Sequence, residues 1–187
     1  MKLLTFAASL RKESFNRKLI HQAVEILKMT PSIQVDRADY REFEMPIYDG
    51  DLEESSGIPN GGKELVRRVQ AADAVVISTP EYNGGMPGTL KNALDWASRN
   101  KPNPFEDKPL LLIGASPGGF GAVRGLWHSR VPFEAVGAFV YPEMFGLAHA
   151  DQAFDESGNF SNPKNRERLE GIIQFYLKFA AGVRLAQ

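Results

Sequence analysis

Residues 74–98 read AVVISTPEYNGGMPGTLKNALDWAS, and three different patterns follow one another in them. The first five residues are a continuous apolar run, which is typical of a strand buried on both faces. A loop rich in proline and glycine comes next. The helix predicted over Pro87–Ser98 has its apolar residues on one face: Leu90, Ala93, Leu94 and Ala97. A strand, a loop and a helix in this order form the unit from which parallel sheets are built.

The same alternation continues on both sides of this stretch. Further strands are predicted over residues 3–8, 33–38, 110–115 and 138–140, of which 33–38 alternates like a half-exposed edge strand. Further helices are predicted over residues 16–29, 62–71 and 163–184, and from about Gly121 onward. Pro132 is expected to end or kink the helix that begins near Gly121. Residues 42–60, with two prolines and several acidic side chains, are expected to form a long loop.

These patterns predict an α/β fold. We expect one domain over residues 1–187, a flavodoxin-like three-layer sandwich with a five-stranded parallel sheet in the order 2-1-3-4-5. Ligands of such sheets bind beyond the carboxyl ends of the strands, near the switch point between strands 1 and 3. The loops that begin at Ser9, Pro80 and Ser116 are therefore the candidate binding loops.

Composition excludes several classes of protein. The chain has 187 residues, no cysteine and a formal net charge of -1. Disulfides, thiolate nucleophiles and cysteine-based metal sites are thus excluded, and the three histidines lack metal-ligand spacing. A near-neutral chain has no overall field to attract nucleic acid. No apolar run reaches membrane-spanning length and no export signal is recognised, so we expect no membrane partner and a cytoplasmic location.

The first candidate loop, SLRKESFN over residues 9–16, is rich in hydrogen-bond donors. It leads into a helix, and a helix N-terminus offers free backbone N–H groups to a phosphate. Ser9, Ser14 and Asn16 add side-chain donors, and Arg11 adds a charge suited to bidentate contact. The alternative is that Ser14 or Asn16 only caps the helix while Arg11 is solvated.

The other two loops are rich in glycine. In PEYNGGMPG over residues 80–88, glycines allow close approach of a ligand, and Tyr82 and Met86 can flank an aromatic ring. The loop is longer than a plain connection requires, although a turn without a ligand is the alternative reading. In SPGGFG over residues 116–121, glycines again let the backbone pack against a planar ligand, or else form a flexible turn.

Three familiar motifs are matched only in part. Residues 114–118 fit the G-x-S-x-G elbow of serine hydrolases around Ser116, but the next residue, Pro117, has no N–H for an oxyanion. Residues 57–63 imitate a phosphate-binding P-loop, but Glu64 stands where Ser or Thr is required. Residues 119–124 begin like a dinucleotide fingerprint, but Arg124 occupies the third glycine position.

The three loops together resemble the NADPH-dependent FMN reductase family, a flavodoxin-like group that includes bacterial quinone and chromate reductases. The resemblance rests on SLRKESFN (Ser9–Asn16), PEYNGGMPGTLKNALDW (Pro80–Trp96) and SPGGFGAVR (Ser116–Arg124), in the expected order and spacing. It implies non-covalent FMN, and it implies NADPH or NADH as the reductant. Two positions depart from the usual pattern: Ala8 replaces a glycine, and Pro132 interrupts a helix that runs on in many relatives.

The resemblance also implies which residues bind the cofactor. The phosphate would be held in the first loop, by Ser9, Arg11, Ser14 and Asn16, with Phe15 beside them. The isoalloxazine ring would be lined largely by backbone groups of Pro80, Glu81, Tyr82, Asn83 and Gly84. Its other edge would be closed by Ser116, Gly118 and Gly119. A backbone amide of the Glu81–Gly84 turn would stabilise the reduced ring, and no acid–base residue is assigned.

The predicted function is an FMN-dependent NAD(P)H oxidoreductase that passes a hydride to quinones or similar small acceptors, with chromate and azo compounds possible, by ping-pong kinetics. The alternatives are a reductase of free FMN as substrate, a flavodoxin-like electron carrier, and a serine hydrolase using Ser116. Arg124 and Lys12 are candidate contacts for a 2′-phosphate, or else solvated. The family resemblance implies a homodimer or homotetramer, and Trp96, Trp127 and Phe133 belong either to the core or to such an interface.

Overall fold

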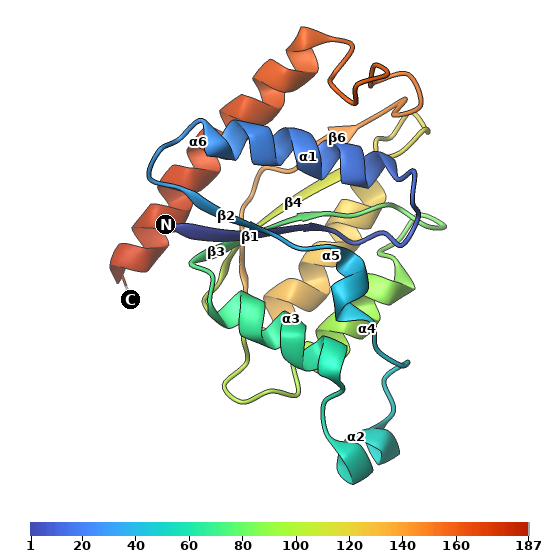
Figure 1. Cartoon of the computed structure of the whole chain (residues 1–187), viewed down its shortest axis with the longest axis vertical. Coiled ribbons are helices and arrows are strands. Elements are labelled where there is room, and N and C mark those ends of the chain that lie inside the picture. The colour runs from blue at the N-terminus through green and yellow to red at the C-terminus, as the bar shows by residue number, and fades with distance from the viewer. Residues whose placement is uncertain (187) are drawn as a thin grey trace.

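The computed structural model describes residues 1–186 and has a parallel β-sheet at its centre (Figure 1). The strands are β1 (Lys2–Ala7), β2 (Gln34–Arg37), β3 (Ala74–Ser78), β4 (Pro109–Ala115), β5 (Phe139–Val140) and β6 (Phe145–Leu147). Their order is β2-β1-β3-β4-β5, with β6 also paired to β4, and every pairing is parallel. This confirms the predicted flavodoxin-like order, and the edge position of β2 agrees with its half-exposed pattern.

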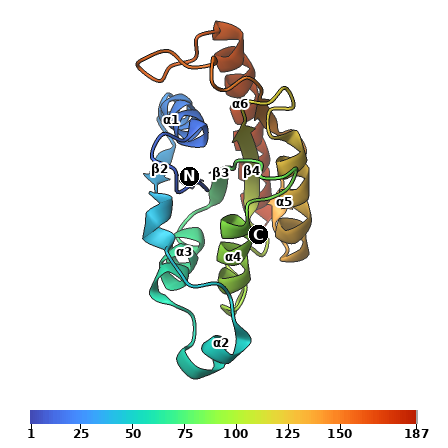
Figure 2. The same ribbon diagram turned by 90° about the vertical axis from the view of Figure 1, so that its right-hand side faces the viewer.

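Helices cover both faces of the sheet, as Figures 1 and 2 show. The helices are α1 (Phe15–Lys28), the 3-10 helix η1 (Tyr40–Phe43), α2 (Gly50–Ser56), α3 (Asn60–Gln70), α4 (Gly88–Ala97), α5 (Val123–Ala135) and α6 (Pro163–Ala186). The core residues of α1 and α6 pack on one face, and those of α3, α4 and α5 pack on the other. Each of α1, α4 and α6 buries one apolar face, and the buried face of α4 holds the predicted Leu90, Ala93, Leu94 and Ala97.

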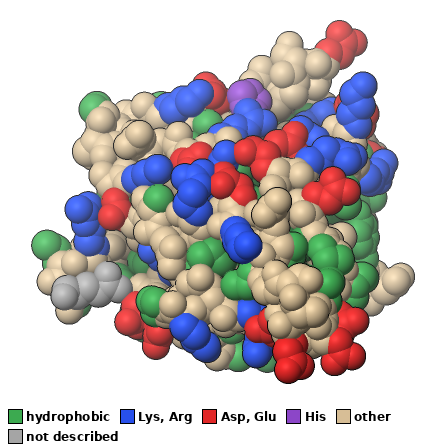
Figure 3. Space-filling view, turned by 60° about the horizontal axis from the view of Figure 1, so that its bottom comes forward, with side chains coloured by type: hydrophobic (Ala, Val, Ile, Leu, Met, Phe, Trp, Pro, Cys, Tyr) green, Lys and Arg blue, Asp and Glu red, His purple; other side chains and the backbone are tan. Residues whose placement is uncertain are grey.

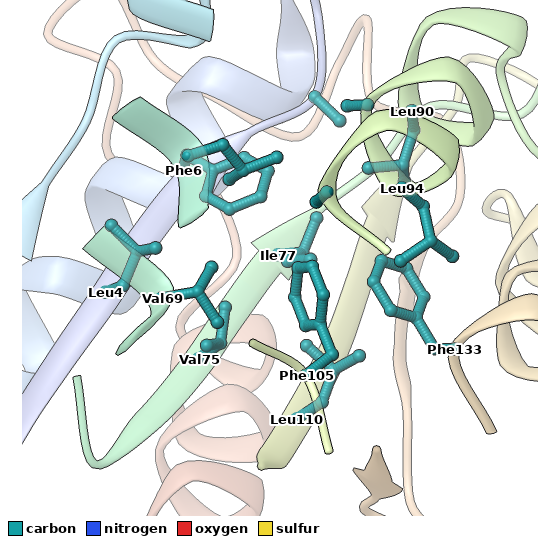
Figure 4. Close-up of a cluster of buried hydrophobic side chains, with 14 of the residues drawn as sticks. Leu4, Phe6, Val69, Val75, Ile77, Leu90, Leu94, Phe105, Leu110 and Phe133 are labelled. Atoms are coloured by element: carbon teal, nitrogen blue, oxygen red, sulfur yellow. The ribbon is translucent and has the colours of Figure 1, made fainter. Parts of the chain in front are cut away.

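Alternation along the buried strands divides the core in two. On β1, Leu4 and Phe6 belong to the cluster under α3–α5, whereas Leu3 belongs to the cluster under α1 and α6. Figure 4 shows the first cluster, in which Phe105 and Phe133 meet edge to face at 5.3 Å between ring centroids. Because both faces are buried, β3 and β4 read as continuous apolar runs.

The fifth position in the sheet is filled by two short strands where one was predicted. β5 pairs with the start of β4, and β6 pairs with the end of β4 at Ile113–Ala115. Pro142 lies between the two strands, and the register against β4 shifts by two residues from β5 to β6. The three residues of β6 are too few to show a period, which is why the sequence pattern did not indicate them.

The prediction of a long loop over residues 42–60 is wrong in part. This segment holds the end of η1, all of α2 and the start of α3. Asp39 forms a capping box with Glu42 at η1, and the Asp49 side chain accepts a hydrogen bond from the Asp51 backbone N–H at α2. α2 has no buried residue and projects away from the sheet in Figures 1 and 2. Local caps rather than an apolar face form this helix, so periodicity could not reveal it.

Of the two effects predicted for Pro132, ending or kinking its helix, the first is wrong. The proline lies inside α5, which continues beyond it to Ala135, so it does not end the helix. Trp96 and Phe133 are buried core residues, whereas Trp127 on α5 is 58% exposed. A core position is therefore confirmed for Trp96 and Phe133 and is wrong for Trp127.

The face of the molecule shown in Figure 3 is not strongly charged of one sign, and the described helices are not strongly apolar over a membrane-spanning length. Charged side chains of both signs are interspersed on the face shown in Figure 3, in line with the near-zero net charge. Among the helices within residues 1–186, none has the length and apolar content that crossing a bilayer requires.

Candidate functional site

The three candidate loops meet in one cleft at the carboxyl ends of the strands. In Figure 1 the loops after β1 and β3 lie on the side opposite the two chain ends. The cleft is lined by Ser9, Arg11, Ser14, Phe15, Asn16, Pro80, Glu81, Tyr82, Ala115, Ser116 and Pro117. Of the predicted residues, Asn83, Gly84, Gly118 and Gly119 belong to the same loops but do not line this cleft. Ala115 and Pro117 line it without having been predicted, since an apolar residue carries no chemical signal.

The first loop presents a row of unused backbone donors. Among residues 1–186, no backbone N–H of residues 10–15 donates a hydrogen bond. Ser14 caps α1 through its side-chain oxygen, which accepts from the Asn16 N–H at 3.2 Å. Ser9 and Ser14 are buried, and the first turn of α1 carries no acidic residue. Free N–H groups at a helix N-terminus, with two buried hydroxyls beside them, form a cradle suited to an anion.

Arg11 supplies the positive charge of this loop. Its side chain is exposed, and among the described residues it forms no ion pair. An arginine without a carboxylate partner at the rim of a cradle of free N–H groups remains available for a bidentate contact with a phosphate.

Asn16 has a different environment from the other predicted phosphate ligands. It is 3% exposed, and its side-chain oxygen accepts hydrogen bonds from the Ser78 hydroxyl and the Ala115 backbone N–H, both at 2.9 Å. Its side-chain nitrogen donates to the Ala115 carbonyl oxygen at 3.0 Å. These contacts span 62 and 99 residues of sequence, so no local pattern could have indicated them.

The second loop is built on a two-residue turn. The backbone groups of Tyr82 and Gly85 exchange hydrogen bonds of 3.1 and 3.0 Å. Asn83 and Gly84 between them have φ values of 52° and 75°, as in a type I′ turn, for which Asn-Gly is the favoured pair. Their N–H groups donate to no atom within residues 1–186. The turn thus presents two backbone donors next to the half-exposed Tyr82 ring.

Glu81 connects the second loop to α5. Its side chain is 7% exposed, and one carboxylate oxygen accepts from the backbone N–H groups of Arg124 and Gly125, each at 3.1 Å. The other oxygen accepts from the Arg124 Nε at 2.8 Å. α5 has no cap of its own, because its N-cap residue is Ala122. Glu81 therefore caps α5 from a neighbouring loop.

This arrangement shifts the pKa of Glu81. Burial alone would raise the pKa of the carboxyl, but hydrogen bonds from Arg124 and Gly125 outweigh burial. They hold the pKa below its ordinary value of 4.5, so the group is ionised at neutral pH. Its charge is thus used to join the loop to the helix.

The third loop does not have the geometry of a hydrolase. The Ser116 hydroxyl accepts a hydrogen bond from the Gly118 N–H at 3.2 Å, and within residues 1–186 it has no hydrogen bond with a histidine. Gly121, with φ 58°, leaves no room for a side chain, because an added Cβ would lie 2.8 Å from the Ala148 nitrogen. Ser116 therefore shapes a turn and lacks the base that a serine nucleophile needs.

Comparison with known proteins agrees with this geometry. The sequence profile described as NADPH-dependent FMN reductase matches residues 1–152. An NAD(P)H-dependent FMN reductase of Pseudomonas aeruginosa is 35% identical, over 93% of this chain and 92% of its own length. A quinone reductase of Escherichia coli K12 is 32% identical, over 99% of this chain and 98% of its own. The chain belongs to the NADPH-dependent FMN reductase family, which confirms the resemblance drawn from the three loops.

Solved structures show the same relationship. FerB, a flavoenzyme NAD(P)H:(acceptor) oxidoreductase of Paracoccus denitrificans, superposes with a TM-score of 0.79 and 29% identity, over 97% of both chains. A flavodoxin from the Archaea superposes with a TM-score of 0.63 at 10% identity, which shows the shared fold alone.

Proposed function

We propose that this chain is an FMN-dependent NAD(P)H oxidoreductase that reduces quinones or similar small acceptors. The observation that carries the proposal is the convergence of the three loops on one cleft, with the unused N–H groups of residues 10–15 at one end. When bound there, FMN would supply the hydride-accepting and hydride-donating chemistry, while the protein supplies binding and orientation. Family membership supports the same assignment.

The first loop fits a phosphate monoester, which carries almost two negative charges. The N–H groups of residues 10–15, the hydroxyls of Ser9 and Ser14 and the Arg11 guanidinium would hold it. Phe15 and Asn16 line the same end of the cleft, and the role of Asn16 is taken up below. The cradle suits a terminal phosphate, which favours FMN.

The second and third loops would hold the ring. The free N–H groups of Asn83 and Gly84 are suited to an oxygen or nitrogen atom that gains negative charge on reduction. Pro80, Glu81 and Tyr82 would line the ring on this side, and Ser116, Gly118 and Gly119 would close its other edge. NADPH or NADH and the acceptor would use the same exposed ring face in turn, which gives ping-pong kinetics.

The assembly we propose is a homodimer or homotetramer. Trp127 and Val131 are one helical turn apart on α5 and are 58% and 69% exposed. Phe120, in the third loop, is 68% exposed. Large exposed apolar side chains on one face of a helix are typical of an interface, and a second copy of the chain would cover them. Dependence on NAD(P)H favours action in the cytoplasm.

Steady-state kinetics test this function. FMN-loaded protein is mixed with NADPH or NADH and a soluble benzoquinone, and the oxidation of the reductant is followed. We expect parallel lines in double-reciprocal plots, because reductant and quinone share one site. Release of the flavin during each turnover would instead favour reduction of free FMN. Absence of NAD(P)H oxidation with every acceptor tried would contradict the enzyme assignment and favour an electron carrier.

A further inference from the structure

The side chain of Asn16 joins three segments that are far apart in the sequence. Asn16 lies in the first turn of α1. Ser78 is the last residue of β3, just before the second loop, and Ala115 is the last residue of β4, just before the third loop. The three hydrogen bonds of 2.9, 2.9 and 3.0 Å therefore connect the end of the first loop with the strand ends that precede the second and third loops.

These contacts leave Asn16 little capacity for a ligand. An asparagine side chain can accept two hydrogen bonds and donate two. Both acceptor positions and one of the donor positions are used by Ser78 and Ala115. Asn16 and Ser78 are 3% and 0% exposed, whereas the unused donors of the cradle belong to the backbone of residues 10–15.

We propose that Asn16 is a positioning residue of the flavin site. Its side chain fixes the three loops relative to one another, and it thereby supports binding of the isoalloxazine ring as much as binding of the phosphate. The proposal rests on the proposed function, because it concerns binding of a flavin by these loops. It assigns Asn16 a role different from the phosphate ligand that the family resemblance implies. Ser78, which does not line the cleft, acts with it.

The physical consequence of removing the amide is specific. Asn16→Ala leaves the Ser78 hydroxyl and the backbone N–H and C=O of Ala115 without their partners in a buried place, which is costly. The loops then adopt the binding arrangement for a smaller fraction of the time. The apparent affinity for the flavin falls in proportion to that fraction, and it falls equally for a flavin with the phosphate and for one without it.

The experiment compares FMN with riboflavin, which lacks the phosphate. Apo-protein is titrated with each flavin, using flavin fluorescence, for wild type, Asn16→Ala, Ser78→Ala and the phosphate-site control Arg11→Ala. Visible circular dichroism of FMN-saturated protein reports the surroundings of the ring. Thermal unfolding of the apo forms shows that each variant is folded, and Ser78→Ala, which removes one hydrogen bond, remains informative if Asn16→Ala is not.

We expect Asn16→Ala to weaken FMN and riboflavin by the same factor, about tenfold or more, and to change the visible dichroism of bound FMN. Ser78→Ala should act in the same direction with a smaller factor. Arg11→Ala should weaken FMN alone and leave the dichroism unchanged. If Asn16→Ala weakens the binding of FMN but changes neither the binding of riboflavin nor the visible dichroism, Asn16 is a phosphate ligand and the proposal is overturned. The proposal is also overturned if Ser78→Ala binds both flavins as wild type does. Failure of wild type to bind either flavin would instead refute the proposed function.

Discussion

At the scale of the residue, side-chain type indicated candidate phosphate donors but not which hydrogen bonds these side chains form within the protein. Ser9, Arg11 and Ser14 could be selected because hydroxyl and guanidinium groups next to a helix start suit a phosphate. Asn16 was selected for the same reason, yet its amide is used by Ser78 and Ala115. Such contacts depend on how distant segments meet, and a single sequence does not carry that information.

Arg11 gives the first prediction. Replacing Arg11 with Ala removes a charged contact to the phosphate, so we expect the dissociation constant of FMN to rise by about tenfold to a hundredfold. The rate of hydride transfer from NADPH at saturating FMN should stay within about twofold of wild type, because the ring contacts are backbone groups. Fluorescence titration and stopped-flow absorbance measure the two quantities. Arg184→Ala, an exposed arginine on α6, is the control, and an unchanged FMN affinity in Arg11→Ala would refute the phosphate assignment.

At the scale of the element, long apolar patterns were predictable and capped or short segments were not. The buried strands β3 and β4 and the helix α4 appeared where periodicity placed them. α2 depends on the Asp49 cap, and β6 has only three residues. Neither a single capping side chain nor a strand of three residues produces a periodic apolar pattern in the sequence.

The cap on α5 gives a prediction about pH. The pKa of Glu81 is lowered in the folded state, so the carboxylate stabilises the fold above its unfolded-state pKa, near 4.5, and this contribution is lost as pH falls through the lower folded-state pKa. Glu81→Gln should lower the free energy of unfolding at pH 7 by about 1–2 kcal/mol. The difference from wild type should shrink as the pH falls below about 4.5.

Urea unfolding at pH 7 and at pH 3.5 measures this effect. Glu25→Gln removes an exposed carboxylate that pairs with Lys28 and should change stability by less than about 0.5 kcal/mol. An equal loss in Glu81→Gln at both pH values would show that the carboxylate charge does not act on α5.

The contact between α5 and the second loop gives another prediction. A Cβ added at Gly125 would lie 3.0 Å from both Cα and Cβ of Glu81, so the loop or the helix must shift. We expect Gly125→Ala to lower the free energy of unfolding by about 1–3 kcal/mol and to weaken FMN binding. Gly171→Ala in α6 is the matched control, because nothing lies within 4 Å of its added Cβ. The control should raise stability by up to about 1 kcal/mol. A higher free energy of unfolding for Gly125→Ala than for wild type would contradict the close packing of Gly125 against Glu81.

At the scale of the whole molecule, the strand order could be predicted, and so could the meeting of the three candidate loops in one cleft. Alternating buried strands and helices imply a parallel sheet, and the switch point of such a sheet indicates which loops bind. The observed order β2-β1-β3-β4-β5 agrees. Assembly could not be predicted from apolar content, because Trp96 and Trp127 look alike in sequence while one is buried and the other is 58% exposed.

The exposed face of α5 gives a prediction about assembly. Introducing charge with Trp127→Glu and Val131→Glu together should convert the proposed homodimer or homotetramer to monomers, because burial of unpaired carboxylates is costly. Sedimentation velocity measures the mass. Phe175→Glu on α6, which changes an aromatic residue of similar exposure, should leave the mass unchanged. A double variant with the same oligomeric mass as wild type would place the interface elsewhere, and a monomeric wild type would refute the proposed assembly.

The visible absorption spectrum of the purified protein shows whether the three-loop cleft retains FMN. The protein is loaded with FMN, unbound flavin is removed by gel filtration, and flavin and protein are quantified. We expect a retained flavin spectrum with about one FMN per chain. A colourless protein would contradict a resident FMN in the three-loop cleft.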